Sequence, residues 1–130
     1  MKNKLRRLKI GNAQYLYSVV RRYYTNTQIS ELIIRIFLSG QKATPLILSF
    51  STVDDYYLGH PLNAGVALMN VKTNMASVVN LNKPAYIRKF ILQGIKNGWT
   101  GTNDIGMQDG LAYLEKFGFE TGKLKPRNKA

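Results

Sequence analysis

Two neighbouring carboxylates and a histidine share one loop-like stretch of the sequence, "STVDDYYLGHPLNAG" (residues 51–65). Asp54, Asp55 and His60, the single histidine of the chain, are residue types that bind metal ions or divide acid and base roles in catalysis. Adjacent carboxylates in a strand point to opposite faces, however, and "VDDYY" is also an ordinary turn sequence. The turn interpretation is favoured, so no metal site, catalytic site or cofactor is predicted.

Cations and tyrosines gather near the start of the chain, where "SVVRRYYTN" follows a segment rich in lysine and arginine. Cationic side chains neutralise phosphates and exposed tyrosine rings stack on unpaired bases, so this pattern suits RNA or single-stranded DNA. The alternative is that the tyrosines fill strand positions while the arginines solvate the outer face. The residues predicted to bind an acidic partner are Lys4, Arg6, Arg7, Lys9, Arg21, Arg22, Tyr23 and Tyr24.

The charge is uneven along the chain. Of 130 residues, 19 are basic and 7 are acidic, which gives a net charge of +12. Residues 1–24 hold seven basic residues and no acid, residues 25–82 are neutral overall, and residues 83–130 hold nine basic against four acidic residues. This basic footprint suits an acidic macromolecule as partner, nucleic acid first and an acidic protein as the alternative.

The composition also narrows the class of protein. Cysteine is absent, which excludes disulfides, a thiol nucleophile and cysteine-rich zinc sites, and which fits a reducing cytoplasm. The basic start is not followed by the apolar run of an export signal, and "LIIRIFL" is far shorter than the ~20 residues that span a bilayer. Phosphate loops and nucleophile-and-base patterns are also missing from the sequence. We therefore expect a cytoplasmic protein that is not an enzyme and does not contact membranes.

About six strands are expected before residue 82. Gly11-Asn12 suits the two-residue turn of a hairpin between strands at about 4–10 and 14–24. The segment "ELIIRIFL" alternates as a strand does and turns through "SGQKAT" into "PLILSFS". A third antiparallel pair, "AGVALMNV" and "ASVVNL", flanks "KTN". The expected arrangement is one meander-like antiparallel sheet, whose open edges could pair two copies in a homodimer.

Helical spacing of apolar residues begins at residue 82. Asn82 is the expected cap of the first helix, Pro84 suits its first turn, and Gly98 stands where the chain leaves it. A second helix is predicted at about 108–117. The apolar faces are predicted to be Ile87, Phe90, Ile91 and Ile95 in the first helix and Met107, Leu111, Leu114 and Phe117 in the second. Strands followed by helices predict an α+β fold with two C-terminal helices packed on one face of the sheet.

One domain is expected over residues 1–122, followed by a basic tail, 123–130, that is predicted to be disordered. The tail either keeps the chain in solution or acts as a mobile arm that adds non-specific affinity for phosphate. Trp99, the single tryptophan, lies in "NGWTGTNDIGMQDG". It either closes the core after the helix or anchors a binding loop, and the core position is favoured.

The segment "VVNLNKPAYIRKFILQGIKNGWTG" resembles the C-terminal part of small uncharacterised bacterial proteins in which a helix follows an antiparallel sheet. The resemblance covers residues 64–118 and implies a single α+β domain and a bacterial origin. Some of these proteins are similar to immunity-type proteins that block a toxin, which implies a protein partner as the alternative to nucleic acid. The resemblance assigns no functional residue.

Overall fold

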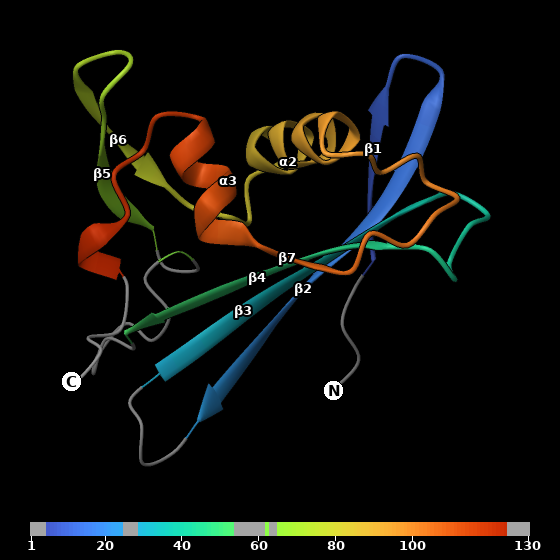
Figure 1. Cartoon of the computed structure of the whole chain (residues 1–130), viewed down its shortest axis with the longest axis horizontal. Helices are drawn as coiled ribbons and strands as arrows, with labels where there is room; N and C mark the ends of the chain where they lie inside the picture. The colour runs from blue at the N-terminus through green and yellow to red at the C-terminus, as the bar shows by residue number, and fades with distance from the viewer. Residues whose placement is uncertain (1–4, 25–28, 54–61, 63–64, 125–130) are drawn as a thin grey trace.

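The computed structural model describes residues 5–24, 29–53, 62 and 65–124. Over these residues the chain forms a five-stranded sheet, a separate two-stranded sheet and two α-helices (Figure 1). The predicted α+β class is confirmed, and both helices lie on the same face of the larger sheet. Asp54, Asp55 and His60 fall outside the described residues, so the interpretation of their loop stays a prediction.

The first four strands form the predicted antiparallel meander. Gly11, with a φ of +59°, and Asn12 make the two-residue turn of the first hairpin, because glycine adopts this left-handed backbone without strain. Along the helix-facing side of the sheet, Ile36 pairs with Tyr17 on one neighbour and Leu46 on the other. The strands are β1 (Arg6–Ile10), β2 (Ala13–Tyr24), β3 (Ile29–Leu38) and β4 (Leu46–Val53).

The third predicted pair forms its hairpin but not as part of the meander. β5 (Val66–Asn70) and β6 (Met75–Val79) make a sheet of their own. The outer edge of β5 is occupied by the chain end that follows the second helix, since the Glu120 N–H donates to the Met69 carbonyl (2.9 Å). The prediction that all six strands form one meander is therefore wrong, because β5 and β6 do not join the larger sheet.

The second predicted helix starts later than its apolar spacing indicates. Residues Met107–Asp109 form strand β7, which pairs in parallel with β4, and α3 spans Gly110–Lys116. Met107 belongs to the strand and is 59% exposed, so it does not join the helical face predicted for it. Asp109 then caps α3, accepting a hydrogen bond from the Leu111 N–H (3.0 Å).

The first predicted helix, α2 (Pro84–Lys96), has Pro84 in its first turn and ends before Gly98, as expected. Its cap differs, because Lys83 takes the N-cap position without a side-chain hydrogen bond. Asn82 instead donates its N–H to the Asn80 Oδ1 (2.9 Å) in the preceding turn. None of the helices that the structure describes is long and apolar enough to cross a membrane.

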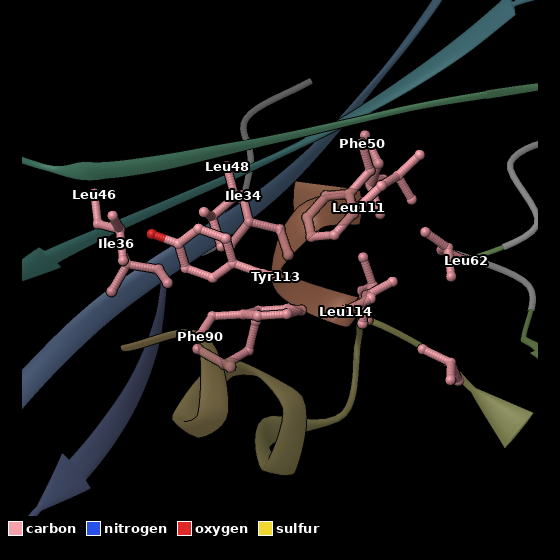
Figure 2. Packing of buried hydrophobic residues seen from close by; sticks show 14 of the residues in the cluster. Ile34, Ile36, Leu46, Leu48, Phe50, Leu62, Phe90, Leu111, Tyr113 and Leu114 are labelled. Carbon is pink, nitrogen blue, oxygen red and sulfur yellow. The ribbon is translucent and has the colours of Figure 1, made fainter. Parts of the chain in front are cut away.

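The core lies between the large sheet and the two helices (Figure 2). Phe90 of α2 is its centre, with ring centroids 5.5 Å from Phe50 and 5.8 Å from Phe117. Ile95, predicted to complete the apolar stripe of α2, is 45% exposed, and the buried position is taken by Gly94. A glycine is needed there because a Cβ at residue 94 would lie 2.5 Å from the Leu46 Cδ2.

Trp99 and the chain end complete the core. Trp99 is 1% exposed and its Nε1 donates to the Thr44 carbonyl (3.1 Å), which confirms the favoured core position. Residues Gly122–Leu124 form a short 3-10 helix in which Leu124 is buried. The packed part of the chain therefore extends two residues past the predicted boundary at 122, and residues 125–130 lie outside the described ranges.

Gly110 provides a test of this packing. A Cβ at residue 110 would lie 2.4 Å from two ring carbons of the buried Phe50, whereas a Cβ at Gly122 meets nothing within 4 Å. We expect Gly110→Ala to lower the free energy of unfolding by about 1–3 kcal/mol, because the rigid ring must move. Gly122→Ala, the control, should change it by less than about 0.5 kcal/mol. Chemical denaturation followed by circular dichroism measures both, and equal stabilities would contradict the packing of α3 on β4.

Candidate nucleic-acid interface

The edge strand β1 presents its cations on two sides. Leu8 and Ile10 pack against the core, so the alternation of the strand turns Arg7 and Lys9 to the opposite face of the sheet. Both are exposed, and so is Arg6, which shares the helix-facing side with Leu8. Among the described residues β1 pairs with β2 alone, so these cations line an open edge of the sheet.

The other predicted binding residues lie elsewhere or outside the described side chains. Arg21 is four residues beyond Tyr17, the partner of Arg6, which places it about 13 Å further along β2. Arg22 pairs with Glu31, so an acid sits directly opposite this cation. The backbones of Tyr23 and Tyr24 extend β2, but their side chains and Lys4 lie outside what the structure describes. The predicted cluster is thus divided into a β1 group and an Arg21-Arg22 group.

Arg6 connects β1 to the start of α2. Its Nη1 donates to the Asn82 carbonyl over 2.9 Å, although the two residues are 76 positions apart in the chain. A pocket of about 110 Å³ lies at this junction, lined by Arg6, Ser18, Val19 and Asn82. Figure 1 shows α2 running between α3 and β1, so one flank of this helix borders the β1 edge. Arg6 therefore shares the helix-facing side of the sheet with the cations of α2, while Arg7 and Lys9 lie on the other face of the same edge strand.

All charged side chains of α2 are cationic. Arg88, Leu92 and Lys96 follow one another at intervals of four and form one row along the helix, with Leu92 42% exposed between the two cations. Lys89 points the other way, toward α3, since its Nζ lies 5.8 Å from the centre of the Phe117 ring. Tyr86 lies on that flank as well, and burial raises the pKa of its hydroxyl. We call Arg6, Arg7, Lys9, Lys83, Arg88 and Lys96 the β1–α2 surface.

The N-terminus of α2 lacks the residues that usually stabilise the start of a helix. Helices favour Ser, Thr, Asp or Asn at the N-cap and acids in the first turn, because these groups complement the free N–H donors and the positive end of the helix dipole. Here Lys83 is the N-cap, its side chain makes no capping bond, and the first turn has no acid. The uncapped, positively charged end of α2 is therefore left to interact with anions from outside the helix.

Clusters of possible metal ligands and buried polar side chains were compared with the sites that the sequence suggested. The residues that the structure describes contain no group of three or more His, Cys, Asp and Glu side chains that could hold a metal ion. The buried polar residue Asn70 serves the fold, since its Oδ1 accepts from the Lys72 N–H (2.9 Å) in the β5-β6 turn.

No protein-family model, curated protein or solved structure matches this chain. The function is therefore inferred from the geometry of the β1–α2 surface.

Sequence reasoning missed the contribution of α2 to this surface. The signal was visible, because the segment from Lys83 to Asn103 contains four cations and no acid. An amphipathic helix usually mixes both signs of charge on its solvent face, so a purely cationic face is informative. The sequence does not show, however, that this helix lies beside β1.

Proposed function

We propose that this chain is a non-catalytic binding protein that engages nucleic acid, RNA or single-stranded DNA first, along the β1–α2 surface. The observation that carries the proposal is that the cationic edge strand β1 lies beside the cationic helix α2, joined through Arg6, and that neither element contains an acidic residue. Each lysine or arginine that neutralises a phosphate releases a counterion, so such a surface binds a polyanion whatever its sequence. Electrostatic attraction also speeds the encounter.

The shape of the surface supports an extended ligand. β1 runs along the edge of the sheet with Arg7 and Lys9 two residues apart, a spacing of about 7 Å, which is close to the distance between successive phosphates in an extended strand. The pocket at Arg6 lies between this edge and the uncapped end of α2. A phosphate placed there meets the free donors of Arg6 and the positive end of the helix together.

A second candidate function is an immunity-type protein that binds an acidic protein partner. One observation favours it: Leu92 and Ile95, 42% and 45% exposed, stand among the cations of α2. Apolar side chains contribute little to a phosphate contact, whereas protein interfaces combine an apolar centre with a charged rim. A saturable one-to-one complex with an acidic protein, together with little affinity for nucleic acid, would identify this function.

Fluorescence anisotropy with labelled single-stranded RNA and DNA tests the proposal. We expect binding whose logarithmic affinity falls linearly with the logarithm of salt between about 50 and 200 mM, with a slope of roughly 0.7 for each phosphate contact on a single strand. Sub-micromolar binding should persist at the upper end of that range. Weak binding that disappears as salt rises would contradict the proposal and favour the protein partner.

A further inference from the structure

The β5-β6 hairpin carries an exposed apolar face. Cross-strand pairs place Met69 beside Ala76 and Ala67 beside Val78 on the same side of the hairpin. All of these side chains are exposed, Met69 by 43% and Val78 by 59%. In Figure 1 the hairpin projects from the rest of the molecule, beside α3 and away from β1. The patch is therefore separate from the β1–α2 surface.

The backbone of β6 has an open outer edge. The Met69 carbonyl accepts from Glu120, so Met69 and its partner Ala76 direct their backbone groups away from each other. Val78, two residues on, follows the same pattern, and its carbonyl accepts the Tyr86 hydroxyl proton (3.2 Å) on that outer side. In the described part of the chain no strand pairs with this edge.

Among the other strand edges of the described sheets, residues 18–24 of β2 also extend past β1 without a strand beside them, although they carry Arg21 and Arg22. The remaining three edges are protected against pairing. β1 carries Arg6, Arg7 and Lys9, β7 has three residues, and β5 is bridged to Phe119. Charged or very short edges are the usual protection against strand association. β6, "MASVV", has neither charge nor proline, so its composition offers no protection against pairing with another strand.

We propose that a second copy of this chain docks on β6, antiparallel and edge to edge, about a twofold axis at Ser77. In this register Ala76 of each copy faces Val78 of the other, and the two residues exchange backbone hydrogen bonds through the groups that point outward. The Val78 carbonyl, which already accepts the Tyr86 hydroxyl of its own chain, accepts the Ala76 N–H of the other copy through its second lone pair. A row of apolar side chains then runs across the joined hairpins, from Met69 through Ala76 to Val78 and Ala67 of the second copy. The edge is thus complementary to itself.

Charge restricts where two copies can meet. Two chains that each carry +12 repel one another, so they associate only where cations are few. The segment 65–82 contains one charged residue, Lys72, which lies in the turn and donates to the Lys116 carbonyl within its own chain (2.8 Å). None of the residues that form this contact belongs to the β1–α2 surface, so the proposed dimer does not depend on what that surface binds.

Sedimentation velocity over a range of protein concentrations tests the dimer. We expect a concentration-dependent dimer that Val78→Lys weakens at least tenfold. In the proposed register each new lysine faces Ala76 of the other copy, so the two lysines lie near each other on the same face of the joined hairpins and repel. Ala76→Pro removes an outward N–H without breaking the β5 pairing and should act in the same way. Met107→Lys is the matched control, since this side chain is also 59% exposed and lies on another edge strand, and its dimer should be unchanged.

A crosslink provides a second readout if Ala76→Pro fails to fold. The chain has no cysteine, so Ser77→Cys introduces a single thiol, placed opposite its own copy at a separation that allows a disulfide. With oxidised glutathione this variant should form covalent dimers, while Thr73→Cys in the turn should not. A chain that stays monomeric at every concentration, or a dimer that Val78→Lys leaves intact, overturns the proposal.

Discussion

Reversing two charges on β1 should remove most of the nucleic-acid affinity. The double substitution Arg7→Glu with Lys9→Glu changes exposed side chains that make no contact with the core, so the fold should be unaffected. Loss of two phosphate contacts lowers the salt slope by about 1.4 and weakens binding roughly 20-fold near 0.1 M salt, before the added repulsion. Anisotropy titrations at several salt concentrations measure both quantities. Arg6 is kept, because it also holds the Asn82 carbonyl.

The control must have the same net charge, since any strongly basic protein attracts nucleic acid at low salt. Lys72→Glu with Lys116→Glu makes the identical change on the hairpin and α3, whose side chains are also exposed. Because the Lys72 Nζ donates to the Lys116 carbonyl, the stability of this control is first compared with that of the native chain by circular dichroism. This control should keep most of the affinity and the salt slope. If both double variants lose affinity equally, binding depends on overall charge alone and the β1–α2 surface is not a site.

Replacing Trp99 with alanine should give the largest loss of stability. Its ring is buried against Tyr15, with centroids 5.9 Å apart, and its Nε1 bonds to Thr44. Truncation of a buried tryptophan creates a cavity and costs about 3–5 kcal/mol, a large part of the 5–15 kcal/mol that stabilises a typical domain. Urea denaturation followed by far-ultraviolet circular dichroism measures the loss, since this variant has no tryptophan fluorescence.

Trp99→Phe separates packing from hydrogen bonding at the same position. It fills most of the cavity but leaves the Thr44 carbonyl without its donor, so its loss of stability should be smaller than that of the alanine variant. Nucleic-acid affinity should be the same for both folded variants and the native chain. Normal stability with reduced affinity would instead mean that the tryptophan anchors a ligand.

Local features of the fold were predicted well from the sequence. The turn at Gly11-Asn12 and the limits of α2 at Pro84 and Gly98 depend on backbone preferences of a few adjacent residues. The alternation of β3 was also correct as far as Ile36, because a strand with one buried face repeats every two residues, whereas Phe37 is buried on the opposite face. The errors came where a distant segment competes: residues 107–109 pair with β4 instead of joining a helix.

The sequence by itself determined that this protein is an α+β domain with a large positive charge, since both follow from composition and local periodicity. The tertiary structure alone decided which cations act together. It brings Arg6 to Asn82 and places α2 beside β1, whereas Arg21 and Arg22 are carried along β2 to a separate position. The physical reason is that neighbours in space are set by how sheet and helices bury their apolar faces together, and exposed charges follow wherever that packing places them.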